Sequence, residues 1–314
     1  METDPGRWGH SLANLGEIWL PVLEAAAPST VVEVGAYAGD VTRLVLDWAK
    51  ESGAKVISID PDPQESLVAL AQANAELELL RATSLEAIPT LPEADAVIID
   101  GDHNYYTVSQ ELRLIAERAG DAALPLLICH DVGWPHARRD SYYNPESIPA
   151  EHRHETVEGG YVFPGETGLR EGGLIYRWPA VREGGQGNGV LTAIEDFLEG
   201  REDLHFALVP AFFGLGVIWE RRAAYADELE AILAPWDRNP LLKRLEANRV
   251  LHLASWQLEG IRAAWCGERL EPRNAILREL LESRAFALAL AISRLAHRGE
   301  APISRERIRR TLED

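Results

Sequence analysis

The stretch VVEVGAYAGD, residues 31–40, passes from β-branched residues through two glycines into a helix-like segment. A dinucleotide-binding turn has the pattern G-x-G-x-x-G, which lets a pyrophosphate lie against a helix N-terminus. Here Tyr37 stands where the second glycine would be, and Glu33 adds a negative charge at the strand end. The turn therefore predicts a ligand that carries a cation and no phosphate. Its predicted contacts are Glu33, Gly35, Tyr37 and Gly39.

Apolar, β-rich runs alternate with helical stretches on either side of this turn. The runs are residues 30–34, 55–60, 77–80, 95–100 and 124–130, and the helices are 40–51, 64–76 and 105–119. Strands that are continuously apolar and alternate with helices form parallel sheets covered on both faces. After a helix at 189–200, the runs 204–210 and 213–220 are too close for a helical crossover and must pair antiparallel. We predict an α/β fold with a Rossmann-like, doubly wound, seven-stranded sheet whose last strand is antiparallel.

The regular alternation stops at Gly133. Residues 133–188 are rich in Gly, Pro, Tyr, Trp and His and show little periodicity. An irregular segment of this length inside a compact domain usually has a function, so we predict a lid or binding loop. From residue 221 onward the composition becomes helical. The sequence thus predicts one domain over residues 1–220 and a helical extension over 221–314, which serves either as a cap on the core or as an interface for homo-oligomers.

The charge balance limits the partners that we expect. The chain has 31 Lys and Arg against 50 Asp and Glu, a formal net charge of -19. Phosphate backbones are bound by clustered cations, so DNA, RNA and anionic membranes are poor partners and a small molecule is favoured. The two cysteines are far apart, no signal-peptide pattern precedes the first helix, and no run of 18 apolar residues occurs. We therefore expect a cytoplasmic protein without a membrane span.

Two further side chains lie where a nucleoside would bind. Asp60 ends the second apolar run, and a carboxylate there is suited to accept both ribose hydroxyls. Ser84 follows the third run, where an adenine would lie. S-adenosylmethionine, with its amino-acid end, sulfonium, ribose and adenine, fits these positions. The two glycines alone suit any strand-to-helix turn, but together with Asp60 and the terminal hairpin the chain resembles the class I S-adenosylmethionine-dependent methyltransferase fold.

Acidic and histidine side chains gather in VIIDGDHNYY (97–106) and LLICHDVGWP (126–135), each at the carboxyl end of a predicted strand. Such strand ends line the ligand crevice of an open α/β sheet. The side chains expected to meet near the sulfonium are Asp100, Asp102, His103, His130 and Asp131. Converging carboxylates repel each other unless a cation lies between them, and Mg²⁺, Mn²⁺ or Ca²⁺ suits such sites. A divalent ion lowers the pKa of an acceptor hydroxyl, and His103 is the candidate general base.

The segments EVGAYAGDVTRLV, DGDHNYYTVSQEL and LLICHDVGWP resemble metal-dependent small-molecule O-methyltransferases. The first is similar to the catechol and caffeoyl-CoA type, and the others to relatives that modify natural products and their sugars. The resemblance covers about residues 30–132 and, more weakly, 189–220. It implies that Asp100, His130 and Asp131 bind the metal and that His103 is the base.

The chain departs from that family at one metal position. Close relatives have Asp-Asn, Asp-Asp or Glu-Asp where this chain has His130 and Asp131. A nitrogen ligand favours Mn²⁺ or Fe²⁺ over Mg²⁺, or else His130 does not bind the metal. Asp102 is then an alternative oxygen ligand, unless it caps the helix that starts near Tyr105.

The predicted lid supplies candidate contacts for the methyl acceptor. Trp134, Tyr142 and Tyr143 are predicted walls for an aromatic or glycosidic group. Arg138 and Arg139 are predicted to hold an acceptor carboxylate or phosphate. Packing of the same side chains on the C-terminal helices is the alternative.

The sequence thus predicts an S-adenosylmethionine-dependent methyltransferase that acts on a hydroxyl of a small molecule, such as a natural product, sugar or phenol. It predicts a divalent metal, Mg²⁺ or Mn²⁺, and His103 as general base. A metal-independent N-methyltransferase is the nearest alternative, because a general base serves either acceptor. A metal-dependent phosphoesterase or hydrolase is a more distant one, because the further histidine and aspartate motifs that it needs are missing. The third alternative is a catalytically inactive protein that binds the cofactor as a sensor. The presence of Asp100, His103 and Asp131 argues against it.

Overall fold

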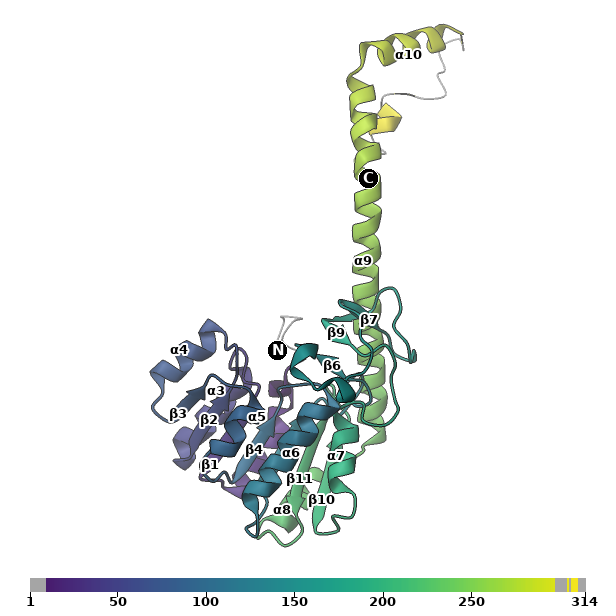
Figure 1. Cartoon of the computed structure of the whole chain (residues 1–314). Helices are drawn as coiled ribbons and strands as arrows, with labels where there is room; N and C mark the ends of the chain where they lie inside the picture. Colours follow the sequence, from purple (N-terminus) through teal and green to yellow (C-terminus); the bar gives the residue numbers. More distant parts are fainter. Residues whose placement is uncertain (1–9, 297–303, 305, 310–314) are drawn as a thin grey trace. The chain divides into compact units, whose positions relative to one another are not determined.

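The computed structural model describes residues 10–296, 304 and 306–309. The chain divides into two compact units, Met1–Ser255 and Trp256–Asp314. A seven-stranded sheet forms the centre of the first unit (Figure 1). The strand order is β10-β11-β5-β4-β1-β2-β3, and β11 runs antiparallel to both of its neighbours. The strands are β1 (Thr30–Val34), β2 (Lys55–Ile59), β3 (Leu77–Leu80), β4 (Ala96–Ile99), β5 (Leu126–His130), β10 (Leu204–Val209) and β11 (Leu215–Glu220). The predicted sheet, with its antiparallel last strand, is confirmed.

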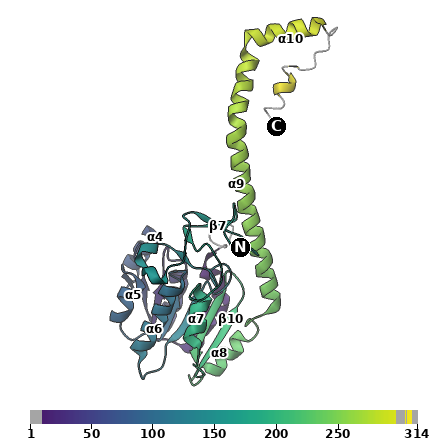
Figure 2. The same cartoon turned by 45° about the vertical axis from the view of Figure 1, so that its right-hand side comes forward.

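Helices cover both faces of this sheet, as its continuously apolar strands require. Neighbouring strand residues point to opposite faces, so Val31 packs in one apolar core and Val32 in the other. The helices of the first core are α2 (Gly16–Ala26), α3 (Asp40–Ser52), α4 (Glu65–Ala73) and α8 (Ala226–Leu233). Those of the second are α5 (Ser84–Ala87), α6 (Tyr105–Ala119) and α7 (Val190–Leu198), and α7 lies beside β10 in Figure 2. Two 3-10 turns, η1 (Leu12–Leu15) and η2 (Ile88–Thr90), complete the layers.

The insertion between β5 and α7, residues 133–188, contains two small antiparallel sheets. In one, β6 (Ser141–Tyr142) pairs with β9 (Trp178–Pro179); in the other, β7 (Gly160–Val162) pairs with β8 (Leu174–Tyr176). Two 3-10 turns lie between β6 and β7: η3 (Pro145–Ser147) and η4 (Ala150–His152). Strands this short cannot produce a clear alternating pattern, which is why the sequence shows little periodicity here.

The carboxylate of Asp140 ties the insertion to two helices of the domain. Its Oδ1 accepts the backbone N–H of Tyr105 at the start of α6 and that of Gly189 just before α7, each at 2.7 Å. Its Oδ2 accepts the hydroxyl hydrogen of Tyr142, also at 2.7 Å. The side chain is buried, and burial raises its pKa, while the two backbone donors oppose that rise. Negative charge at a helix N-terminus is favourable, so one carboxylate stabilises two helix starts.

The first unit extends beyond the predicted domain end at residue 220. Helix α8 packs Leu229 and Leu233 into the core, and the start of α9 (Pro240–Glu282) buries Val250 and Ala254 in a cluster with insertion residues. These apolar contacts join residues 221–255 to the sheet domain.

The second unit holds the rest of α9 together with α10 (Arg284–Ala296). Large apolar side chains are exposed along it: Trp256, Leu270, Ile276, Leu280, Leu288 and Ile292. An oligomer interface on these helices stays a prediction. Within the described ranges, no helix has the length and apolar character that a membrane crossing needs.

Candidate active site

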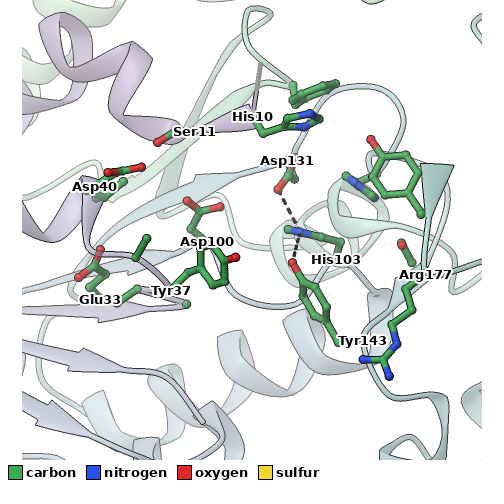
Figure 3. Close-up of a pocket in the computed structure, with 18 of the residues that line it drawn as sticks. His10, Ser11, Glu33, Tyr37, Asp40, Asp100, His103, Asp131, Tyr143 and Arg177 are labelled. Carbon is green, nitrogen blue, oxygen red and sulfur yellow. Dashed lines mark hydrogen bonds and ion pairs between the residues drawn. The ribbon is translucent and has the colours of Figure 1, made fainter. Parts of the chain in front are cut away.

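The loops that follow β1, β4 and β5 meet the insertion at a cavity of about 520 Å³. These loops leave the carboxyl ends of parallel strands, where open α/β sheets hold their ligands. Figure 3 shows the side chains that line it: Glu33, Asp40 and Asp100 on one side, and His103, Tyr143 and Arg177 on the other. The cavity therefore has an acidic end and an end that carries histidine, tyrosine and arginine.

The turn after β1 brings Gly35 against the loop after β4. Gly35 has a φ of +84°, and a Cβ at this position would lie 2.3 Å from the carbonyl oxygen of Asp100. A side chain there would displace the loop that carries Asp100. Gly39, with a φ of +83°, is the N-cap residue of α3. Tyr37 lines the cavity and is 64% exposed. An aromatic residue thus stands where a dinucleotide-binding turn has its second glycine.

The Glu33 carboxyl is buried in the wall of the cavity. Its Oε2 accepts hydroxyl hydrogens from Thr42 at 2.7 Å and from Ser58 at 2.6 Å. Burial raises the pKa of Glu33 to about 7, and the two hydroxyl bonds offset only part of this rise. A cationic group in the cavity would stabilise the ionised carboxylate, which is the chemistry that the sequence predicts for this turn.

Asp60, in the loop after β2, and Ser84, the first residue of α5, do not line the cavity. The carboxylate oxygens of Asp60 accept the backbone N–H groups of Tyr37 at 2.7 Å and of Asp62 at 2.8 Å. Each oxygen keeps a second lone pair for a further donor. Ser84 is buried at the start of α5, near Glu111 of α6, whose pKa is raised by burial to about 8. Asp60 therefore positions the Tyr37 turn in addition to any ligand contact.

Asp100, His130 and Asp131 come together at the ends of β4 and β5. One potential ligand atom from each lies within 4.8 Å of the others. The Nδ1 of His130 is 2.9 Å from Asp100 Oδ1 and 3.4 Å from Asp131 Oδ2. Asp102 stands apart from this cluster: its Oδ2 accepts the hydroxyl hydrogen of Thr107, and the N-cap of α6 is Asn104. The structure thus brings the three predicted metal ligands together. Asp102 belongs neither to this cluster nor to the N-cap of α6.

The hydrogen bonds of His130 define which of its nitrogens carries hydrogen. Its Nε2 lies 2.8 Å from the carbonyl oxygen of Phe212, which only accepts, so Nε2 carries a hydrogen. Burial by itself lowers the pKa of His130, but the charges of Asp131 and Asp100 outweigh it and raise the pKa well above its ordinary value. The imidazolium therefore holds two carboxylates together, and removal of its Nδ1 proton would leave a lone pair directed at both.

His103 lies between the cluster and the insertion. Its Nδ1 is 3.0 Å from Asp131 Oδ2, and its Nε2 is 3.0 Å from the hydroxyl of Tyr143. Because the carboxylate only accepts, Nδ1 carries the hydrogen and the neutral ring has its lone pair on Nε2. Burial lowers the pKa of His103, yet the charges of Asp131 and Asp100 outweigh it and raise that pKa overall. Burial also raises the pKa of Tyr143, so its phenol stays a neutral donor.

The predicted arginine contacts of the insertion are not in the cavity. Arg138 makes a two-pronged ion pair with Glu195 of α7 at 2.6 and 2.7 Å. Arg139 is buried and donates to the carbonyl oxygens of Ala180 and Thr167. Neither guanidinium lines the cavity, and both are bound within the insertion or to α7, so an acceptor anion at these two residues stays a prediction. These cations are bound by groups far along the chain, which local sequence does not reveal.

The three predicted aromatic walls have different environments. Tyr142 and Tyr143 both line the cavity, but the hydroxyl of Tyr142 is bound to Asp140. Trp134 does not line it and packs on an apolar cluster that includes Val162 and Phe213. Tyr143 is therefore the predicted wall whose hydroxyl faces the candidate base.

Several lining residues carry no signal in the sequence. His136 is buried and stacks on His103 with ring centroids 4.5 Å apart, and Tyr176 meets the edge of His136 at 4.8 Å. His10 stacks on Phe213 at 5.2 Å. These rings come from the N-terminal segment, the insertion and the loop before β11, and only the folded chain brings them together.

Residues 32–132 match the family model described as a methyltransferase domain. This part of the chain is a methyltransferase domain. It runs from β1 to the loop after β5 and so contains the Glu33 turn, the Asp100 cluster and His103. The match supports the predicted methyltransferase over these residues, and the strand order of the sheet agrees with the predicted fold. A search of curated protein sequences found no match.

The chain is also similar, at low identity, to solved methyltransferase structures. PaMTH1 of Podospora anserina, solved with S-adenosylhomocysteine, is 14% identical, with a TM-score of 0.43 over 69% of this chain and 82% of that one. The 1,6-didemethyltoxoflavin N1-methyltransferase of Burkholderia thailandensis is 13% identical, with a TM-score of 0.36 over 67% and 78%. Human N-acetylserotonin methyltransferase is 14% identical, with a TM-score of 0.35 over 66% and 53%.

Replacement of Glu33 by glutamine should change how stability depends on pH. The folded pKa of about 7 lies above the ordinary 4.5, so the native state of the wild type holds this proton more tightly than the unfolded state does. The wild type therefore loses unfolding free energy at this site as the pH rises from about 4.5 to about 7. Glu33→Gln keeps an acceptor for Thr42 and Ser58 but does not titrate, so its stability relative to wild type should rise by roughly 3 kcal/mol across that window. Urea unfolding of the unliganded proteins measures the difference, and parallel pH curves would contradict the raised pKa.

Proposed function

We propose that the protein is an S-adenosylmethionine-dependent O-methyltransferase that acts on a hydroxyl of a small molecule, such as a natural product, sugar or phenol. The observation that carries this proposal is the Asp100, His130 and Asp131 cluster beside His103, in the wall of the cavity that the Glu33 turn also lines. One cavity thus offers places for a cationic cofactor, a divalent ion and a general base. A metal mainly assists hydroxyl acceptors, so the cluster favours oxygen over nitrogen as the methylated atom.

The proposed cofactor contacts are Glu33, Gly35, Tyr37, Gly39, Asp60, Ser84 and Asp100. When bound, S-adenosylmethionine supplies a methyl group on a positively charged sulfur. Glu33 and Asp100 provide negative charge at the cavity wall, which attracts the ammonium and the sulfonium. The free lone pairs of Asp60 suit the ribose hydroxyls, and Gly35 allows the close backbone approach that this turn needs.

The chemistry of the donor set fits a divalent ion. His130 donates its Nε2 hydrogen to the carbonyl oxygen of Phe212, and this bond orients the ring. Histidine ligands of metals commonly donate such a hydrogen bond from the nitrogen that does not bind the metal. Two carboxylates and one imidazole suit Mn²⁺ or Fe²⁺ as well as Mg²⁺. When bound, the ion supplies charge that lowers the pKa of an acceptor hydroxyl. Asp100, His130 and Asp131 are the residues that would hold it.

His103 is the proposed general base. Asp131 fixes the hydrogen on Nδ1, so Nε2 is the atom that receives the proton of the acceptor hydroxyl. As that proton moves, the acceptor oxygen forms its bond to the methyl carbon and the bond from this carbon to sulfur breaks. The products are the methyl ether and the uncharged thioether, with one proton left on His103. Asp131 stabilises the charged ring that results.

The cofactor assignment predicts that Asp60→Asn weakens the binding of S-adenosylhomocysteine by roughly tenfold or more, because an amide is a poorer acceptor for two hydroxyls than a carboxylate. Isothermal titration calorimetry measures the affinity. Asp62→Asn is the matched control, since only the backbone of the exposed Asp62 contacts Asp60. Equal affinities of Asp60→Asn and wild type would remove the assignment.

The metal assignment predicts that the protein binds Mn²⁺ and that Asp131→Asn weakens this binding at least about tenfold. Electron paramagnetic resonance of Mn²⁺ gives the bound fraction without any need for an acceptor. Asp40→Asn is the control, because Asp40 lines the same cavity outside the cluster. Methyl transfer should also stop in EDTA and return with Mn²⁺ or Mg²⁺. Full activity in EDTA would exclude the metal role.

The base assignment predicts that His103→Gln lowers turnover by roughly 10²- to 10⁴-fold. Binding of S-adenosylhomocysteine and of Mn²⁺ should stay close to wild type, because His103 is assigned to neither ligand. Turnover is measured with any hydroxyl acceptor that the wild type methylates. A variant that works at the wild-type rate would show that another group takes the proton.

A further inference from the structure

Arg177 lines two neighbouring cavities of the first unit. The second cavity, of about 740 Å³, is formed by the insertion and shares Tyr143 and Arg177 with the first. Trp178 and His154 also line it. The candidate base contacts Tyr143 in the first cavity, so the second cavity lies across this shared wall from the proposed reaction centre.

The backbone at Arg177 is held on both sides. Tyr176 pairs with Gly160 in one small sheet, and Trp178 pairs with Tyr142 in the other. The carbonyl oxygen of Arg177 accepts the N–H of Gly159 at 2.8 Å. Arg177 is therefore the residue that joins the two sheets of the insertion, and these contacts fix its backbone.

The guanidinium of Arg177 has no hydrogen-bond or ion-pair partner within the described part of the chain. Other arginines of the insertion differ in this respect. Arg138 is paired with Glu195, Arg139 with Glu183, and Arg153 of the second cavity with Glu146. Arg177 is exposed, and an arginine fork without a carboxylate partner is suited to bind an anion in a two-pronged geometry.

Charge is distributed unevenly along the first cavity. Of its four carboxylates, Glu33 and Asp40 lie on one side, while Asp100 and Asp131 lie toward the middle (Figure 3). Arg177 lies on the other side, beyond Tyr143. Among the described residues that line this cavity, Arg177 is the single arginine and there is no lysine. The acidic end attracts a cationic cofactor and repels an anion, whereas Arg177 attracts an anion away from the acidic end.

We infer that Arg177 binds a carboxylate or phosphate group of the methyl acceptor. The acceptor is then an acidic hydroxylated compound: its hydroxyl reaches His103 and its anionic group reaches Arg177 at the entrance to the second cavity. Tyr143 and Trp178 give that second cavity aromatic walls for the remainder of the molecule. The role of the hydroxyl rests on the proposed function, whereas anion binding at Arg177 does not.

The test compares matched anionic and neutral probes on protein loaded with S-adenosylhomocysteine. The pairs are 3,4-dihydroxybenzoate with its neutral amide, and glucose 6-phosphate with glucose, so the two arms separate a carboxylate from a phosphate. Calorimetry should give at least one anion a roughly tenfold advantage over its neutral partner in the wild type. Arg177→Gln should remove this advantage and Arg177→Lys should keep part of it, because lysine retains the charge without the fork.

Arg182→Gln is the matched control, since Arg182 is an exposed arginine of the insertion that lines neither cavity. It should keep the full anion advantage. If neither anion is preferred by the wild type, or if the preference survives in Arg177→Gln, the inference is overturned. If S-adenosylhomocysteine does not bind but free protein shows the preference and loses it in Arg177→Gln, the proposed function fails and the anion site stands.

Discussion

The geometry of the site depends on the hydrogen bonds that the buried carboxylate of Asp140 accepts. It accepts hydrogens from the backbone at the starts of α6 and α7 and from the Tyr142 hydroxyl. These donors are shielded from water, so loss of the carboxylate would leave them unpaired at a considerable cost in stability. Ser141, the next residue, donates its N–H to the carbonyl oxygen of His103 at 2.9 Å. The anchor that holds the insertion therefore also sets the distance between the proposed base and Tyr143.

The surroundings of two carboxyl groups in the same cavity shift their pKa values in opposite directions. Glu33 has only hydroxyl donors, and burial raises its pKa to about 7. Burial acts in the same direction on Asp131, but the positive charges of His130 and His103 outweigh it and lower that pKa well below its ordinary value. Such divergence commonly separates the roles of acids in one active site. Permanent negative charge is thus concentrated beside the proposed base and metal, whereas Glu33 gains its full charge most readily when a cation is near.

Much of the sheet, and of the candidate site at the carboxyl ends of its strands, could be predicted from the sequence. Strands such as 30–34 and 126–130 are buried on both faces, so they appear as continuous apolar runs, and the side chains that follow them must meet at one edge. That logic correctly brings Asp100 and Asp131 together. It could not give the hydrogen bond from His130 to Phe212, because the two residues are far apart in the chain and the loop before β11 has no local signal.

The insertion shows the limit of the same reasoning. Arg138, Arg139 and Arg177 are indistinguishable as residue types, and local sequence favoured the first two as anion contacts. In the structure, Arg138 pairs with Glu195 on α7, and Arg139 donates to carbonyl oxygens of Thr167 and Ala180, later in the insertion. Arg177 acquires its place only because two short sheets meet on either side of it. Long-range pairing of this kind leaves no periodic pattern in the chain.

The contact between Tyr143 and His103 means that two hydroxyls compete for one lone pair. In the proposed reaction, an acceptor that gives its proton to neutral His103 has to replace the Tyr143 phenol at Nε2, and the number of hydrogen bonds at that nitrogen does not change in the exchange. Tyr143 is 55% exposed as a residue, so water can take over the hydrogen bond of the displaced phenol. Tyr143 therefore covers the proposed base in the absence of an acceptor, and a group without a donor hydrogen gains no hydrogen bond by approaching it.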